Sequence, residues 1–224
     1  MESAGTRDYG SGVTTLGRDA GGLLPLARLL DSEYGVREAR RLQAQEYLRI
    51  GYVPGSDALR ADGTLRDDLD PWVAHSRHFG AFDQAGGVRA TCRVIGGEAP
   101  WPLPTLQLPT MDPRVRRELQ RLPSEQLGEI SALARDLDVG PEFTRAVFRA
   151  LWLDGLERGL THWVLSVDRI VLRLLRGMSE TLFRVAGEPS PAPVRPVLPV
   201  WIKVADVSGD IFTRGLTPAL VVLP

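Results

Sequence analysis

Residues 128–139 read GEISALARDLDV and are the most informative stretch of the sequence. Apolar and polar residues alternate through the middle of this stretch, which is the pattern of a half-buried strand. Gly140 and Pro141 follow directly, and proline is favoured in the first turn of a helix. Apolar residues then cover most of the circumference of a helix that extends to Gly159. The stretch therefore predicts a strand that leads into a long core helix.

The segments after this helix continue the alternation of strand and helix. Residues 161–167, THWVLSV, predict a short strand, and Asp168 is a suitable N-cap for the next helix. Residues 181–187 and 197–206 predict two closing strands. For the helix we expect one apolar stripe and an outer row of Arg169, Arg173 and Arg176, with the stripe formed by Ile170, Val171, Leu174, Leu175 and Met178.

The segments before the central strand predict a strand, a helix, a long loop and a hairpin. A strand is expected within residues 23–30. Asp31 or Ser32 then serves as the N-cap of a helix that extends to Gly51. Residues 55–71 form a polar, acidic loop, and loops of that length are often functional. The hairpin pairs residues 78–83 with 88–96 around a glycine-containing turn.

A proline-rich passage separates the hairpin from the central strand. Residues 100–109, PWPLPTLQLP, predict an extended surface segment. Asp112 and Pro113 then supply an N-cap and a first-turn proline for a helix that Pro123 ends. The whole order predicts an α/β fold with a mixed sheet flanked by helices.

Composition narrows the class of protein. The chain has 224 residues, is 43% hydrophobic and carries a formal charge of −1, so we expect one globular domain over residues 21–224 after a polar leader at 1–20. The balanced charge gives no indication of nucleic-acid binding. Cys92 is the single cysteine, and the sequence shows neither a secretory signal nor an apolar run of about 18 residues. These features predict a cytoplasmic protein without a transmembrane segment.

Four local sequences carry a resemblance to known enzymes: EYLRIGYVP (46–54), RDDLDPW (66–72), VRATCRVI (88–95) and GEISALARDLDV. With the order of elements, they resemble the GCN5-related (GNAT) acyltransferases, and most of all the long-chain N-acyl amino acid synthases and acyl-homoserine lactone synthases. The pattern departs at Ala132, where these families usually have arginine, and at Glu46 and Tyr47, where an aromatic after an apolar residue is common.

The resemblance implies that Arg93, Glu129 and Ser131 are catalytic. Glu129 would take the proton of an amine that attacks a thioester, because a carboxylate among apolar strand neighbours has a raised pKa. The alternative is a structural glutamate that is paired with an arginine such as Arg93. Ser131 would donate to the pantetheine or the oxyanion, or it would hydrogen-bond locally within the strand.

The acceptor is expected to meet charged residues. Arg93 would hold an acceptor carboxylate bidentately, or it would neutralise Glu129. Asp67 and Asp70, three residues apart in the acidic loop, would bind the acceptor's ammonium group, or they are solvated surface acids. The sequence leaves each of these alternatives open.

The donor is expected to be a thioester on a pantetheine arm. In the resembled folds the central strand diverges from its neighbour, so the arm would bind along residues 133–145, through Leu133, Ala134, Arg135, Leu137, Val139, Gly140 and Arg145. The segment 136–145 has a single glycine, whereas users of acetyl-coenzyme A have a glycine-rich turn for the pyrophosphate. We therefore favour an acylated acyl carrier protein as the donor, with acyl-CoA as the alternative cosubstrate. The basic docking surface for the carrier would come from Arg114, Arg116, Arg117, Arg121, Arg145 and Arg149.

Other candidates are weaker. His75 and His78 lack a further ligand cluster, so no metal site is expected. Cys92 is expected to be a small core residue. An acyl tunnel would be lined by Phe148, Trp152, Trp163, Met178 and Phe183, although residues of these types at such spacings usually form plain core.

The sequence thus predicts an N-acyltransferase that moves a medium or long acyl chain to an amino acid or a related small amine. Three alternatives remain. The chain could be an acyl-homoserine lactone synthase that uses S-adenosylmethionine, a small-molecule or peptide acetyltransferase, or a non-catalytic module that binds an acyl carrier or a lipid.

Overall fold

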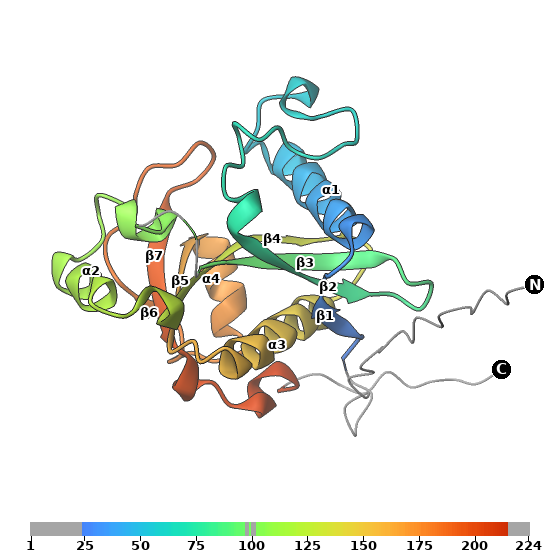
Figure 1. The fold of residues 1–224 in the computed structure, drawn as a ribbon. Coiled ribbons are helices and arrows are strands. Elements are labelled where there is room, and N and C mark those ends of the chain that lie inside the picture. Colours follow the sequence, from blue (N-terminus) through green and yellow to red (C-terminus); the bar gives the residue numbers. More distant parts are fainter. Residues whose placement is uncertain (1–23, 97–98, 100–101, 215–224) are drawn as a thin grey trace, which may run out of the picture.

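A computed structural model describes residues 24–96, 99 and 102–214 and shows a mixed sheet with helices on both faces (Figure 1). The predicted leader at 1–20 lies outside these residues. The sheet has the order β1-β2-β3-β4-β5-β7-β6. Its strands are β1 (Ala27–Leu29), β2 (Ser76–Phe82), β3 (Val88–Gly96), β4 (Leu127–Arg135), β5 (His162–Asp168), β6 (Arg184–Val185) and β7 (Val197–Lys203). The α-helices are α1 (Glu33–Ile50), α2 (Pro113–Gln120), α3 (Pro141–Glu157) and α4 (Arg169–Arg176).

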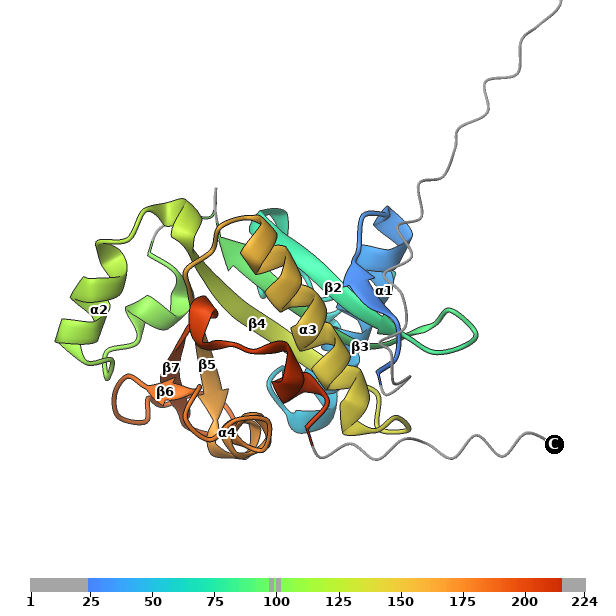
Figure 2. The same cartoon turned by 90° about the horizontal axis from the view of Figure 1, so that it is seen from below.

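The pairing of strands places β4 at the centre of the sheet. β4 is antiparallel to β3 and parallel to β5, and α3 forms the crossover between β4 and β5. Helix α1 lies over one face of the sheet, and α3 crosses the opposite face (Figures 1 and 2). The larger hydrophobic cluster fills the α3 and α4 face, and a second cluster packs residues near α2 against the other face. These observations confirm the predicted α/β class.

Local sequence signals account for most element boundaries. Ser32, Asp112 and Asp168 each cap a helix by accepting a backbone N–H, as their residue types predict. The αL glycine Gly51 ends α1. The hairpin turn is held by Asp83, whose carboxylate accepts the backbone N–H groups of Ala85 and Gly87.

Close packing of α3 against β5 requires a glycine inside the helix. The Trp163 ring lies against α3 so that a Cβ atom on Gly155 would come within 2.8 Å of its Cζ2 atom. On the sheet, a Cβ atom on Gly128 would come within 2.8 Å of Val94 Cγ1. Gly155 therefore leaves room for the indole against α3, and Gly128 leaves room for the Val94 side chain of β3 beside β4.

One expectation about local structure is partly wrong and a second is wrong. In the expected stripe of α4, Leu175 and Met178 are buried and Val171 packs against the core, and the three arginines are exposed, but Ile170 and Leu174 are 58% and 44% exposed. Leu172, which the stripe left out, is buried instead, because the apolar residues cover a wider arc of the helix than the core contacts. The proline-rich passage is not extended throughout, because Pro104–Gln107 form a 3-10 helix, η3, whose residues Thr105 and Leu106 are buried.

Candidate active site

A row of polar side chains crosses the sheet face opposite α3. Ile95, Leu127 and Val164 belong to the hydrophobic cluster on this face. Side chains alternate along a strand, so the residues two positions away point to the same face, namely Arg93 on β3, Glu129 on β4 and Ser166 on β5. His78 on β2 pairs with Arg93 across the strands, and Arg93 in turn pairs with Ser131. The sheet thereby brings together all three residues that were predicted to be catalytic.

Glu129 is a buried carboxyl group that lacks the predicted arginine partner. Its side chain is 3% exposed, and its Oε2 accepts the backbone N–H of Thr105 at 2.8 Å. Burial raises the pKa of Glu129 to about 7, although the Thr105 hydrogen bonds and the charge of Arg93 act in the opposite direction. A carboxyl group that titrates near neutral pH is suited to accept and return a proton.

Arg93 forms its ion pair with Asp70. Its Nη1 atom lies 2.6 and 2.8 Å from the two Asp70 oxygens, and the side chains are 5% and 4% exposed. Arg93 was expected either to pair with Glu129 or to bind an acceptor carboxylate. The structure shows that it pairs with Asp70 and not with Glu129. The Nε atom of Arg93 has no hydrogen-bond partner in the part of the chain described.

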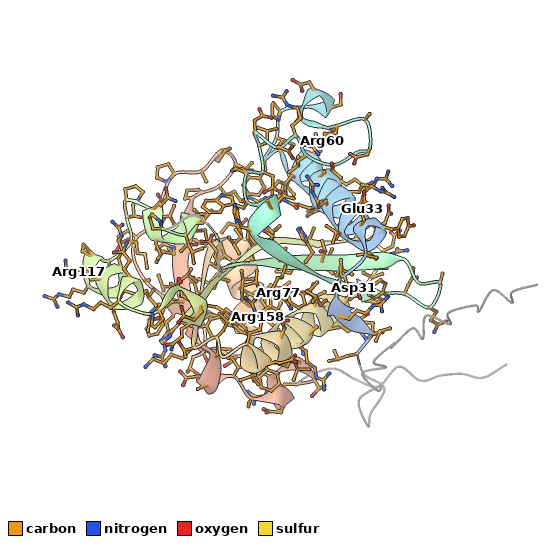
Figure 3. The ribbon with its side chains drawn as sticks, viewed as in Figure 1. Asp31, Glu33, Arg60, Arg77, Arg117 and Arg158 are labelled. Carbon is orange, nitrogen blue, oxygen red and sulfur yellow. The ribbon has the colours of Figure 1, made fainter. Side chains whose placement is uncertain are left out.

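Asp67 does not join Asp70. Its side chain is 64% exposed and pairs with Arg60, and Arg40 lies 3.8 Å away. Arg60 lies in the loop above the end of α1, at the periphery of the molecule (Figure 3). The two aspartates that were predicted to act together are thus one buried and one surface residue.

Gln43, Thr105 and Ser166 belong to this polar region but were not singled out from the sequence, and Tyr47 and His78 were not expected at the site. Gln43 on α1 is buried, and burial raises the pKa of Tyr47 while the Gln43 side chain acts in the opposite direction. Burial, together with the Arg93 charge, lowers the pKa of His78 to about 4, and its Nε2 atom has no partner among the described residues. Thr105 and Ser166 complete the set through a contact of 2.8 Å between their hydroxyl oxygens. Strand register and the packing of α1 and η3 on the sheet bring these residues together, so no local signal could have revealed them.

The central strands diverge next to Glu129. The last parallel pair between β4 and β5 is Glu129 with Val164, yet β4 continues to Arg135. A register shift in the β3–β4 pairing coincides with Ala132, whose φ of 53° is left-handed. Leu133, Ala134 and Arg135 therefore line an edge of β4 that β5 does not pair.

The loop after β4 leads to the N-terminus of α3. Leu137 is exposed, and the Arg135 guanidinium donates to the carbonyl of Val139. Gly140 is the N-cap of α3 without a side-chain cap, and a Cβ atom on Gly140 would overlap the Glu142 carboxylate. Arg145 donates to the backbone carbonyl of Arg214. The residues predicted to bind the pantetheine arm are contiguous here, but an acidic side chain covers the helix end.

The remaining candidates fall within the core. Burial raises the pKa of Cys92 to about 12, which makes a thiolate nucleophile unfavourable. Within the described residues no group of three or more His, Cys, Asp or Glu side chains could hold a metal ion. An apolar cavity of only about 10 Å³ lies between Phe148, Trp163, Met178 and Phe183, while Trp152 packs against Phe212. No helix in the described ranges is long and apolar enough to cross a membrane.

Comparisons with known proteins identify the fold through structure. No family model and no curated protein sequence matches the chain. FeeM, an N-acyl amino acid synthase from uncultured soil microbes, aligns with a TM-score of 0.59 and 18% identity over 81% of this chain and 91% of that one. The acyl-homoserine lactone synthase LasI aligns with a TM-score of 0.60 and 14% identity over 86% and 97% of the two chains.

A third structure, the CoA-dependent acyl-homoserine lactone synthase BjaI with SAM and isopentyl-CoA, has a TM-score of 0.60 and 13% identity over 84% of this chain and 86% of that one. Likeness at these identities concerns the arrangement of the elements. The chain therefore has the GNAT-like acyltransferase fold that its sequence resembles.

Proposed function

We propose that this chain is an N-acyltransferase that moves a medium or long acyl chain from a carrier-protein thioester to the amine of an amino acid or a related small amine. The observation that carries this proposal is the position of Glu129, a buried carboxyl group with a pKa of about 7 beside the point where β4 and β5 diverge. The matched structures named as acyltransferases support the reaction class.

The reaction joins an amine to an acyl carbon and releases a thiol. Its rate depends on removing a proton from the attacking amine and on donors that face the developing oxyanion. Glu129 serves as the base. Backbone amides of residues 133–139 hold the thioester arm along the unpaired edge of β4. Arg93, held by Asp70, keeps its Nε–H for a polar group of the acceptor.

The α3 N-terminus favours a carrier-bound arm over coenzyme A. A diphosphate at a helix N-terminus needs free backbone N–H groups. Pro141 lacks an N–H, and the Phe143 N–H is directed to the Gly140 carbonyl at 3.3 Å. The Glu142 carboxylate lies against Gly140 and adds a negative charge at that end. A carrier arm, which has one phosphate, is repelled less than coenzyme A.

Helix α4 is a better docking surface for an acidic carrier than the α2 region, which supplied four of the six arginines of the predicted surface. Each helix region exposes three arginines without an ion-pair partner among the described residues. They are Arg114, Arg117 and the C-cap residue Arg121 at α2, and Arg169, Arg173 and Arg176 on α4. Arg117 points away from the body of the protein (Figure 3). Only α4 adds exposed large apolar residues, Ile170 and Leu174, which a carrier helix of mixed character would contact.

Topology gives a second reason to prefer α4. Helices α3 and α4 begin at the carboxyl ends of the parallel strands β4 and β5, beside the divergence, whereas α2 precedes the amino end of β4. Figure 2 shows α2 apart from α4. A carrier on α4 could therefore direct its arm toward residues 133–139.

The proposal is tested by incubating the protein with acylated carrier protein and a pool of amino acids and searching for N-acyl products by mass spectrometry. Glu129→Gln should abolish product formation, whereas the matched change Glu125→Gln, at an exposed position four residues earlier, should retain it. Product from acyl-CoA but not from the acylated carrier would overturn the donor assignment. A lactone product with S-adenosylmethionine would overturn the acceptor. Tight carrier binding without turnover would indicate a binding module.

A further inference from the structure

Glu129 is enclosed to an extent that conflicts with direct contact between its carboxylate and an amine. The 3-10 helix η3 lies over it, and Thr105 of η3 is completely buried while its backbone N–H donates to Glu129 Oε2. An amine in the opening between β4 and β5 would have to displace this segment. A proton, in contrast, needs only a continuous set of hydrogen bonds.

The structure contains such a set of hydrogen bonds. Thr105 donates its backbone N–H to Glu129 Oε2 at 2.8 Å, and its side chain acts to lower the pKa of that carboxyl group. The Thr105 Oγ1 atom lies 2.8 Å from Ser166 Oγ. Ser166 is exposed, although its neighbours Leu165 and Val167 in β5 are buried. It lies two residues beyond Val164, the last β5 residue that pairs with β4. The three groups thus connect a buried carboxyl group to a solvent-facing hydroxyl where the strands diverge.

We propose that Thr105 and Ser166 form a hydroxyl relay that carries the proton of the attacking amine to Glu129. This inference rests on the proposed acyltransferase function. As the N–C bond forms, the amine passes a proton to Ser166 Oγ, the Ser166 proton moves to Thr105 Oγ1, and the Thr105 proton moves to Glu129. As the C–S bond breaks, the same route returns one proton to the departing thiolate, so the products are an amide and a thiol.

Hydroxyl groups are suited to this role because each can donate and accept at the same time. The charged and titratable groups on the same face include Arg93 on β3, Asp70 in the loop and His78 on β2, with Arg40 and Tyr47 on α1. Arg93 is paired with Asp70, and the lowered pKa of His78 keeps its ring neutral. Thr105 is the hydrogen-bonding partner recorded for Glu129 within the described part of the chain.

The decisive variants are Thr105→Val, which removes the hydroxyl but keeps the shape and the backbone N–H, and Thr105→Ser, which restores a hydroxyl. We expect Thr105→Val to lower kcat by about 10- to 100-fold with little change in the acceptor KM, and Thr105→Ser to recover most of the rate. Ser166→Ala should lower kcat similarly, while the exposed control Ser124→Ala should have no effect. Equal kcat values for wild type, Thr105→Val and Ser166→Ala would overturn the relay.

A second measurement does not require turnover. Infrared titration of the Glu129 carboxyl band, identified by its loss in Glu129→Gln, should give a higher pKa in Thr105→Val than in wild type, because the hydroxyl stabilises the carboxylate. Thr105→Ser should return it toward the wild-type value. An unchanged titration in Thr105→Val would overturn the relay even if the protein forms amides. A shifted titration in a protein that forms no amide with any donor would confirm the hydrogen bond but overturn both the relay and the proposed function.

Discussion

Asp70 and Glu129 are two carboxyl groups buried to nearly the same extent on one face of the sheet, yet their surroundings differ. Asp70 lies against the guanidinium of Arg93, which contacts both carboxylate oxygens. Glu129 has a backbone N–H and a hydroxyl as partners, and burial raises its pKa to about 7. The two groups thus differ in their partners rather than in their burial, and we propose only Glu129 as a proton acceptor.

The largest effect is expected for Glu129→Gln, which keeps the shape of the side chain but removes its ability to take a proton. Amide formation should fall by about 10²- to 10⁴-fold, the usual contribution of a general base. Rates measured with acylated carrier protein, with Glu125→Gln as the control, check this expectation. A Glu129→Gln protein with more than half of the wild-type rate would show that both carboxyl groups are structural.

A large loss of stability is expected for Asp70→Asn. This change leaves the Arg93 guanidinium buried beside a neutral group, and breaking such a buried pair costs about 3–5 kcal/mol. Urea unfolding measures the free energy directly. The double variant Asp70→Asn with Arg93→Met should recover part of the loss, since no unpaired charge remains. A loss below about 1 kcal/mol in the single variant, the range of exposed pairs, would mean that Asp70 and Arg93 are not tightly paired.

The raised pKa of Glu129 should also make the stability of the protein depend on pH. The folded-state pKa of Glu129 lies above the unfolded value near 4.5, so its contribution is complete below that value and is lost as the pH rises through about 7. Above pH 7 the Glu129→Gln protein should be more stable than wild type by up to roughly 3 kcal/mol. Unfolding of both proteins between pH 4 and 8 tests the sign. A difference that does not change with pH would contradict the raised pKa.

The smallest effect is expected for Asp67→Asn in the same loop as Asp70. Its ion pairs are exposed, and such pairs contribute up to about 1 kcal/mol and weaken with salt. Stability should change by less than that amount, and the acceptor KM should stay the same. A several-fold rise in KM would restore the original expectation that Asp67 binds the acceptor's ammonium group.

The elements defined by local sequence could be predicted, whereas the contacts across the sheet could not. Ser32, Asp112 and Asp168 predict where helices begin, because an N-cap side chain binds a backbone N–H only two or three residues further along the chain. Arg93 and Asp70 are 23 residues apart, and Thr105 and Ser166 are 61 apart, so register and loop folding determine their contacts. Residues 100–109 were predicted to be extended, whereas Pro104–Gln107 form the 3-10 helix that covers Glu129.

If Glu129 is the base of an amide-forming reaction, the rate of that reaction depends on the ionisation of its carboxyl group, and the pH dependence of the rate measures this directly. With acylated carrier protein as donor, the wild-type rate should rise with pH through a limb near 7, because the carboxyl group must be ionised to accept a proton. The residual rate of Glu129→Gln should lack this limb under identical conditions. The same limb in both proteins, or no amide product from wild type at any pH, would contradict the account.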